Sequence, residues 1–466
     1  MHGEVVICGA GLAGLAAGHA LAGAGREVAV FEREVEVGGL ARTVEHRGQR
    51  FDLGGHRLLT DSARVCDLVR EVVHEPLLQV PRSSKILLRG RYVDYPLRPL
   101  NAVSGFGPLA SLRALGGYVA AQLAHRVRPK PLQNLEDWVV RHYGRPLFET
   151  FFKPYSEKVW GLECGQISAD WVAQRIQGLT LGAAIRHSLL RPADAGPRTL
   201  TNKFLYPARG IGSIAEGLRA AIAVRRGRVF AQSPVVRVMH RAGRIERVAV
   251  RRGEHNEICH ATEFISSLPL PLLARLLQPA APRDVLAAAA RLRYRDLVLV
   301  AVRLARERAT DQTWIYVPGR EYTFGRLHEP KNWSRQMGAP GESLLVAEHF
   351  CSRTDAIWRD DDDVLVSRCI DELAALGLVA RSEALDGVVV RVPHAYPAFE
   401  VGYGRASAAV TEYLAGFANL QVIGRTGAFR YDNMDHAIES GLQAADAVLA
   451  RTAAPGHALP RTGTDA

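Results

Sequence analysis

The sequence of 466 residues lacks several patterns that mark common protein classes. None of its six cysteines forms a Cys-x-x-Cys pair, so we predict reduced core residues and a cytoplasmic protein. The sixteen histidines show no His-Glu-x-x-His spacing, which predicts no catalytic metal. Ser83-Ser84 and Ser266-Ser267 lack the context of a nucleophile elbow, which argues against a hydrolase.

Membrane-spanning and nucleic-acid-binding patterns are also missing. Residues 5–25 are apolar but have no charged segment or cleavage site, and Arg113 and several glycines interrupt the run at 102–124. The formal charge of +11 comes almost entirely from arginine, as coding bias in a GC-rich genome produces, and no basic run has interleaved aromatics. We predict no membrane span and no nucleic-acid partner. The positive charge that coding bias does not explain predicts an anionic small molecule as the substrate.

The first turn of the chain carries the strongest motif. An apolar run ends in Gly9, Gly11 and Gly14 at Gly-x-Gly-x-x-Gly spacing, and a second apolar run, Val28–Phe31, leads to Glu32. In such a unit the glycines permit a tight turn, close approach of a pyrophosphate and packing of the helix on its strand, and the acid binds a ribose hydroxyl. The predicted contacts here are Gly9, Gly11, Leu12, Ala13, Gly14, Glu32 and Arg33.

The next segment points to a flavin. Gly38-Gly39-Leu-Ala-Arg42-Thr43 is followed by Gly54-Gly55-His56, a continuation that NAD-type dehydrogenases do not need. It resembles the signature of the FAD family that contains amine oxidases, protoporphyrinogen oxidases, desaturases and UDP-galactopyranose mutase. The resemblance implies that the first turn contacts the flavin phosphates and the second lies near the isoalloxazine ring. The residues it assigns to FAD are Gly39, Leu40, Ala41, Arg42, Gly54, Gly55 and His56.

The pattern of the whole chain predicts an α/β fold. We expect a discontinuous Rossmann-type FAD-binding domain over residues 1–95, 201–290 and 413–452. A helical substrate insertion at 96–200 and a substrate domain with an antiparallel sheet at 291–412 would interrupt it, and 453–466 would be a disordered tail. Strands are predicted at 229–238, 245–250, 263–267, 294–304, 313–317, 343–350 and 386–392, with a hairpin at 84–95. The connecting stretch 191–200 is expected to be mobile, and Asp360–Asp363 to start a helix.

A polar and aromatic segment follows in the insertion. Lys153-Pro-Tyr155-Ser156-Glu-Lys158-Val-Trp160, with the later Arg175, combines stacking surfaces with cationic groups, although an amphipathic helix pair anchored by tryptophan would also explain it. The segment resembles the substrate-side helix of UDP-galactopyranose mutases. The resemblance implies that Trp160 and its neighbours hold a uridine, and that Arg175 lies near the diphosphate and the flavin.

Two further motifs resemble the same mutases. Gly424-Arg425 to His436 is similar to their C-terminal motif, which implies that Gly424, Arg425, Asn433 and Met434 contact FAD and that Tyr431 binds diphosphate. Tyr316 with Arg326, ten residues later, resembles a second diphosphate motif. The same resemblance assigns Tyr95, Arg98 and Tyr396 to substrate, Val236 to FAD, and catalytic roles to His56, Arg175 and Arg326. Departures from the pattern stand at Arg98, Ser156 and Trp333, on the nucleotide and sugar side.

The arginines also have a physical rationale of their own. A guanidinium binds phosphate bidentately and stays charged, so Arg175 and Arg326 could together hold a diphosphate.

The resemblance implies a flavin-dependent sugar-nucleotide mutase. Such an enzyme interconverts pyranose and furanose forms through an adduct between flavin N5 and the sugar, and it needs reduced FAD, with NAD(P)H as one reductant. Its partner would be a nucleoside-diphosphate sugar or similar anionic molecule, and the oligomeric state stays open. Two alternatives remain: an FAD oxidoreductase acting on an anionic or sugar-nucleotide substrate, and a binding protein similar to GDP-dissociation inhibitors, against which the Gly-Gly-x-x-Arg turn argues.

Overall fold

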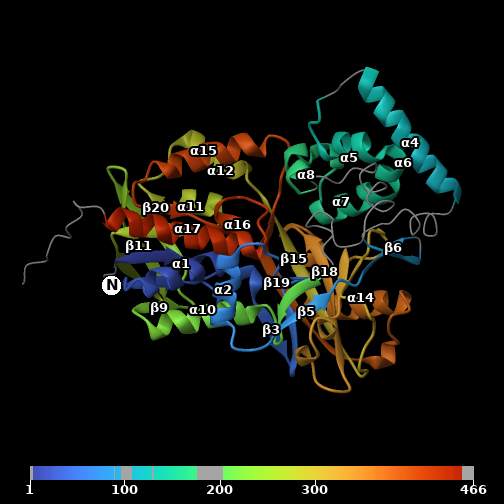
Figure 1. Cartoon of the computed structure of the whole chain (residues 1–466), viewed down its shortest axis with the longest axis horizontal. Helices are drawn as coiled ribbons and strands as arrows, with labels where there is room; N and C mark the ends of the chain where they lie inside the picture. The colour runs from blue at the N-terminus through green and yellow to red at the C-terminus, as the bar shows by residue number, and fades with distance from the viewer. Residues whose placement is uncertain (1–3, 89, 96–107, 128–130, 176–202, 454–466) are drawn as a thin grey trace, which may run out of the picture.

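The computed structural model describes residues 4–88, 90–95, 108–127, 131–175 and 203–453. Three sheets organise this part of the chain: a parallel sheet of five strands, a second sheet of four and a third of seven. Figure 1 shows the parallel sheet with its helices at one end of the molecule and a separate helical layer at the other. The predicted α/β class is confirmed, whereas the expected tail and the connecting stretch 191–200 fall outside the described residues, apart from Ala453.

The five-stranded sheet forms the half of the molecule in which the sequence predicts a dinucleotide site. Its strands run parallel in the order β20-β13-β1-β2-β9. β1 and β2 are apolar and buried along their whole length, as expected for central strands covered on both faces. The bounds are β1 (Val5–Cys8), β2 (Val28–Phe31), β9 (Gly227–Phe230), β13 (Glu263–Ser266) and β20 (Leu420–Val422).

Small residues let the helices of this half approach closely. A Cβ on Gly14 would lie 2.0 Å from the Gly9 carbonyl oxygen, and one on Gly441 would lie 2.1 Å from that of Ala13. Helix α1 therefore packs tightly on its own turn and on the last helix. The helices of this half are α1 (Leu12–Gly23), α2 (Ala63–Val72), α10 (Gly212–Val224), α16 (Gly424–Gly427) and α17 (Met434–Ala453).

The four-stranded sheet corrects one prediction. Residues 229–238 were expected as a single strand, but the chain leaves β9 after Phe230 and re-enters as β10 at Val235, in a different sheet. The break falls at Gln232-Ser233-Pro234, between two apolar runs, and the proline, which lacks an N–H, was the signal that the prediction overlooked. The elements here are β10 (Val235–Arg241), β11 (Arg244–Arg252), β12 (His255–His260), β14 (Leu277–Gln278), α11 (Leu270–Leu276), α12 (Arg283–Arg291) and α15 (Tyr403–Ala415).

The seven-stranded sheet has the order β19-β15-β18-β17-β16-β6-β7. Its predicted strands are confirmed, and so is the hairpin at 84–95. The hairpin, however, joins this sheet through β16 and not the parallel one, so sheet membership changes before Ser84 and not at residue 95. The elements are β6 (Ser84–Leu88), β7 (Arg91–Asp94), β15 (Tyr294–Leu304), β16 (Trp314–Tyr316), β17 (Arg326–His328), β18 (Ser343–Cys351), β19 (Ala384–Pro397), α13 (Ala356–Arg359) and α14 (Asp362–Ala375).

The helical layer is formed by described residues between Pro108 and Arg175. Figure 1 shows α4 as its outermost helix, lying over α5 and α6. The helices are α4 (Pro108–Val127), α5 (Leu135–Tyr143), α6 (Arg145–Leu147), α7 (Lys153–Trp160) and α8 (Ala169–Arg175), with a π-helical turn at Phe148–Phe152. Among the described residues, no helix is long and apolar enough to cross a membrane.

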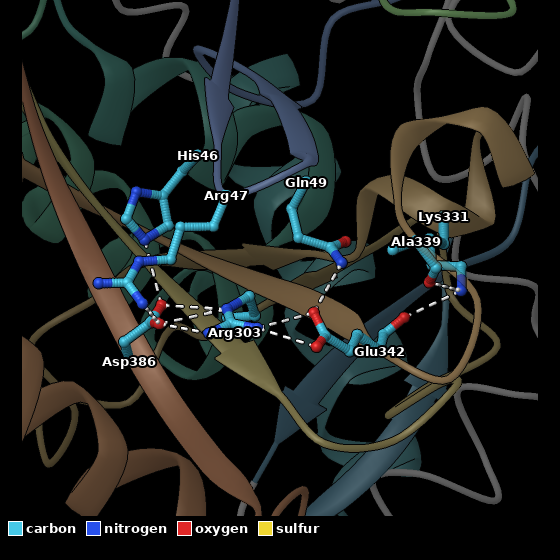
Figure 2. A network of polar contacts seen from close by, with 8 residues as sticks. All are labelled: His46, Arg47, Gln49, Arg303, Lys331, Ala339, Glu342 and Asp386. Carbon is cyan, nitrogen blue, oxygen red and sulfur yellow. Dashed lines mark hydrogen bonds and ion pairs between the residues drawn. The ribbon is translucent and has the colours of Figure 1, made fainter.

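A polar network ties the two halves together (Figure 2). The hairpin of β3 (Thr43–His46) and β4 (Gln49–Asp52) leads from one predicted flavin turn to the other. Asp386 on β19 accepts from Arg303 Nε at 3.2 Å and contacts His46 Nε2 at 3.1 Å. Glu342 accepts from Arg303 Nη1 at 2.9 Å and from Gln49 at 3.2 Å. The hydrogen bonds from Arg303 lower the pKa of both carboxyl groups, and the tip of the hairpin is thereby fixed on the seven-stranded sheet.

Removing the shared arginine should destabilise the protein. In Arg303→Met two partly buried carboxylates lose the cation that they share, although Asp386 keeps Arg47 at 3.4 Å, and we expect the free energy of unfolding to fall by about 1.5–3 kcal/mol at pH 7. Urea denaturation measures this. Arg70→Met is the control, because the Arg70–Asp67 pair is exposed and contributes about 0–1 kcal/mol. Equal losses in the two variants would contradict a structural role for the network.

Candidate functional site

Two glycine turns that are distant in sequence meet at the start of α1. Gly9 has a φ of +101°, a left-handed conformation that favours glycine. The Gly38 N–H donates to the Ala10 carbonyl oxygen at 2.8 Å. A Cβ on Gly39 would lie 3.3 Å from Gly11 Cα. The two turns predicted to contact the dinucleotide phosphates are therefore in direct contact, and Leu40, Ala41 and Arg42 follow at their edge.

The C-terminal motif reaches the same place. A Cβ on Gly424 would lie 3.0 Å from that of Ala13, in the first turn of α1. The Gly424 N–H donates to Ser440 Oγ at 3.1 Å, which fixes the turn on α17. Asn433 and Met434 stand where α17 begins. Three segments assigned to FAD from sequence thus meet at the N-terminus of α1: the first turn, the Gly38-Gly39 turn and the Gly424 turn.

Glu32 lies buried at the end of β2, beside the first turn. Its Oε2 accepts from the Ala10 N–H at 2.8 Å. The backbone N–H of Ser233 donates to the Glu32 carbonyl oxygen at 2.6 Å, which brings the start of β10, and with it Val236, to this edge. Arg33 turns outward, where its Nε pairs with Glu34 at 2.9 Å. The acid occupies the place that the motif predicts.

The residues at these turns fit a bound FAD. Arg42 Nε, Arg425 Nε and Arg425 Nη2 are buried and have no hydrogen-bond partner among the described residues. A Cβ on Gly11 would meet no atom within 4 Å, so the space beside this turn is open. Buried polar groups are nearly always paired, and guanidinium donors beside a glycine turn are what phosphate oxygens require.

A buried ion pair forms the floor of the site. Arg326 on β17 donates through Nε to Glu348 Oε1 at 2.7 Å and through Nη2 to Oε2. His328 Nδ1 lies 3.2 Å from the same carboxylate, which is fully buried on β18. Burial alone would raise the pKa of Glu348, but the Arg326 charge and the hydrogen bonds from His328 and Arg326 lower it to about 2. The carboxylate is therefore ionised at neutral pH.

The second flavin turn lies directly on this pair. Gly54 has a φ of +133°, and a Cβ there would lie 3.3 Å from Glu348 Oε2 and 3.6 Å from Arg326 Nη2. His56 follows with its Nδ1 buried and unpartnered among the described residues. Burial, reinforced by the charges of Arg326 and Arg425 and opposed by Glu348, lowers the pKa of His56 to about 3. Its imidazole is neutral under physiological conditions.

Aromatic side chains from separate segments line the other side. Arg326 Nη2 donates to the Tyr396 hydroxyl at 3.3 Å. The Arg425 guanidinium carbon lies 4.8 Å from the Tyr396 ring centroid and 4.5 Å from that of Tyr431. Tyr316 stands edge-on to Tyr155, at 5.5 Å, and to Tyr95, at 5.1 Å. The predicted substrate tyrosines therefore gather around Arg326 and Arg425.

Tryptophans connect this cluster to the helical layer. Trp160 on α7 lies 4.7 Å from Trp171 on α8, and Trp171 lies 5.9 Å from Tyr431. Both indoles are buried, so they serve as packing anchors between the helices and the loop before α17.

Some predicted residues are placed elsewhere or not described. Arg98 lies outside the described residues, and of Arg175 only the backbone position at the end of α8 is given. Ser156 lies half-buried on α7. Trp333, expected on the sugar side, is buried in the core and stacks on Trp314 at 5.5 Å. The large side chain of Trp333 therefore packs against another core residue, and this packing accounts for its size without a ligand.

Two residues at the buried ion pair of Arg326 were not predicted from the sequence. Glu348 and His328 were not singled out, although Glu348 interrupts the otherwise apolar run of β18. A charged residue inside a buried strand requires a partner, and this was the available signal. Phe399 was also missed; it stacks on Trp171 at 6.0 Å.

The free energy of unfolding at acidic pH should depend on the buried pair of Arg326 and Glu348. Because the pKa of Glu348 is depressed from 4.5 to about 2, its contribution to stability is fully present above pH 4.5 and is lost as the pH falls through about 2. Glu348→Gln should lose about 3 kcal/mol at pH 7, since Arg326 is left unpaired, and should decline less steeply over that window. Denaturant titrations from pH 7 to pH 2 measure both effects. Glu45→Gln on the exposed hairpin is the control, and parallel curves for Glu348→Gln and wild type would refute the assignment.

The open space beside Gly11 yields a second test. Gly11→Val should fold, since its Cβ meets no protein atom, but the side chain would occupy the space of the pyrophosphate, and the flavin absorbance should fall by tenfold or more. Gly404→Val is the matched control, because it is exposed on α15 and its Cβ is equally unobstructed. Circular dichroism checks the fold of both. A fully yellow Gly11→Val protein would show that this turn does not hold the cofactor.

Known proteins share this fold over nearly the whole chain. The structure of reduced UDP-galactopyranose mutase superposes with a TM-score of 0.84 at 22% identity, covering 97% of this chain and 94% of that one. Putrescine oxidase bound to putrescine superposes with a TM-score of 0.63 at 18% identity, covering 97% and 100%. At these identities the likeness establishes the fold alone.

Curated relatives give shorter or more distant matches. L-amino acid oxidase Cdc18 of Crotalus durissus cumanensis is 45% identical over 68 residues, but these span only 15% of this chain and 14% of the oxidase. Coproporphyrinogen III oxidase of Mycobacterium tuberculosis (strain CDC 1551 / Oshkosh) is 24% identical over 474 residues, covering 96% of this chain and 98% of that protein.

The match to a family is more extensive. Residues 12–449 match the family described as flavin containing amine oxidoreductase. This range begins just after Gly11 and includes the Gly38-Gly39 and Gly54-Gly55 turns, the buried ion pair and the C-terminal motif. The chain therefore belongs to the flavin-containing amine oxidoreductase family, and it is a flavoenzyme.

Proposed function

We propose that this chain is a flavin-dependent sugar-nucleotide mutase, which interconverts the pyranose and furanose forms of a sugar linked to a nucleoside diphosphate. The observation that carries the proposal is the group of tyrosines around Arg326 and Arg425, which come from α7, β16, β19 and the loop before α17. Phenol hydroxyls and guanidinium groups are donors suited to a diphosphate. The fold shared with UDP-galactopyranose mutase adds support. The tyrosines are Tyr155, Tyr316, Tyr396 and Tyr431.

The cofactor in this proposal is FAD in its reduced state, with NAD(P)H as the electron source. Reduced FAD supplies a nucleophilic nitrogen, N5, to such a reaction. The protein must then keep the diphosphate close while it is detached from the sugar, so that its return competes with escape.

Arg425 is better equipped than Arg326 to hold that diphosphate. Arg326 directs Nε and Nη2 to Glu348, whereas Arg425 has two buried donors without a partner among the described residues. We propose that Arg425 shares these two donors between the FAD phosphates beside the Gly424 turn and the detached diphosphate. The diphosphate contact that the sequence assigned to Arg326 then passes to Arg425 and the tyrosine hydroxyls. Arg326 instead positions Tyr396. Arg175 and Arg98 remain predicted contacts.

His56 contributes as a neutral group. With its pKa lowered to about 3 by burial and by the nearby arginines, it carries no charge at neutral pH. Its Nδ1 has no partner among the described residues and is free to exchange a hydrogen bond with a ligand. A neutral imidazole beside two arginines hydrogen-bonds a reacting group without adding a further positive charge.

A second candidate is an FAD oxidoreductase acting on an anionic or sugar-nucleotide substrate. It is favoured by the full-length alignment with coproporphyrinogen III oxidase. The same arginines and tyrosines would then bind an anionic substrate whose electrons pass to the flavin. The two functions differ in the redox state of the flavin: it stays reduced during turnover in a mutase, whereas an oxidoreductase substrate reduces the oxidised flavin.

Anaerobic turnover separates them. Dithionite-reduced protein should convert many equivalents of a UDP-sugar into its ring isomer, measured by chromatography, while the flavin spectrum stays reduced. Tyr431→Phe should raise KM several-fold, since it removes one hydroxyl donor worth about 0.5–1.5 kcal/mol. Tyr413→Phe on α15 keeps its ring packing on Phe417 and should leave KM unchanged.

The opposite result is equally clear. If the oxidised protein bleaches when substrate is added, by one equivalent per flavin, and no isomer forms, the protein is an oxidoreductase and the mutase proposal fails.

A further inference from the structure

Helix α4 presents an apolar face that nothing in the described structure covers. Six of its side chains are between 48% and 79% exposed: Leu109, Leu112, Leu115, Val119, Leu123 and Val127. At about 100° per residue they fall within a stripe about 120° wide along the helix. Single exposed apolar residues are common, but a contiguous stripe of this kind marks an interaction surface.

The opposite face of α4 is already occupied. Ala114, Gly117, Tyr118, Ala121 and Gln122 are partly buried against α5 and α6. A Cβ on Gly117 would lie 2.4 Å from Pro146 Cδ, and Gln122 Nε2 donates to the Arg141 carbonyl oxygen at 2.9 Å. The helix is therefore fixed with its stripe directed outward. Figure 1 shows that it is the outermost helix of its layer.

The charged residues of α4 are all of one sign. Between Pro108 and Val127 the sequence has Arg113 and Arg126 and no aspartate or glutamate. By the same helical geometry, exposed Arg113 lies about 40° beyond one edge of the stripe, and exposed Arg126 lies about 20° inside the other edge, in the last turn of the helix. On the helices below, Glu136 and Glu149 are paired with Arg145, at 2.9 and 3.7 Å.

We propose that α4 is a docking surface for an anionic lipid membrane, on which the helix lies without crossing it. An apolar stripe with arginines along its edges places aliphatic side chains among the acyl chains and guanidinium groups at the phosphates. A second copy of this chain fits the charges less well. Pairing two such stripes would bring four arginines together with no acid from either α4.

Vesicle sedimentation of the flavin-loaded full chain tests this. At low salt the protein should bind vesicles of equal parts phosphatidylglycerol and phosphatidylcholine at least tenfold more than phosphatidylcholine alone. Leu112→Gln with Leu123→Gln should reduce this binding about tenfold or more, because it removes the inserted side chains. Arg113→Gln with Arg126→Gln should reduce it about fivefold per charge, as should raised salt.

Controls separate docking from misfolding. Val224→Gln with Val364→Gln removes two equally exposed valines on α10 and α14 and should bind like wild type. Every variant should keep its flavin absorbance and melting temperature, since the altered residues are exposed. The proposal is overturned if wild type does not bind the anionic vesicles, or if the leucine variant binds them as well as wild type. It is also overturned if wild type is an oligomer that the leucine variant converts to monomer, because a second copy then covers the stripe.

Discussion

The buried pair of Arg326 and Glu348 is the interaction on which the candidate site depends. A carboxylate without solvent exposure is costly unless its oxygens are satisfied, and here Arg326 and His328 satisfy them. The pair joins β17 to β18, supports the Gly54 turn and positions the Tyr396 hydroxyl. Its two charges act on the pKa of His56 in opposite directions, so that burial is the main cause of its fall to about 3. The Gly54 turn and the tyrosines around Arg326 therefore both depend on this ion pair, and a change in the pair would affect both.

Much of this arrangement could be predicted from sequence. The glycine spacing before α1, the second glycine pair and the Gly424 turn are local patterns whose geometry follows from backbone freedom and close approach. Their meeting point was implied by the family resemblance. The strands of the seven-stranded sheet also follow from alternation of apolar residues. These features could be predicted because each depends on residues that are adjacent in the chain.

What escaped prediction depends on partners far apart in sequence. Glu348 becomes significant only when Arg326 and Gly54 are brought to it, and Trp333 is a core residue only because Trp314 stacks on it. The hairpin β6–β7 has no local signal that would assign it to one sheet over another. Likewise the anchoring of β3–β4 needs Arg303, Glu342 and Asp386, none of which belongs to a motif. Such long-range pairing is a property of the tertiary fold.

The distribution of unpaired donors bears most directly on the chemistry. Arg326 is neutralised by Glu348, so its side chain brings little net charge to a ligand. Arg425 instead stacks on two tyrosines and has no carboxylate partner among the described residues. The two unpaired Arg425 donors therefore suit a bound anion. The glycine turns next to Gly424 would hold the FAD phosphates, and Tyr396 and Tyr431 add hydroxyl groups in a second position, beside the Arg425 guanidinium. A site built only for hydride transfer from a neutral amine would have no use for donors in that second position, whereas a detached diphosphate requires them.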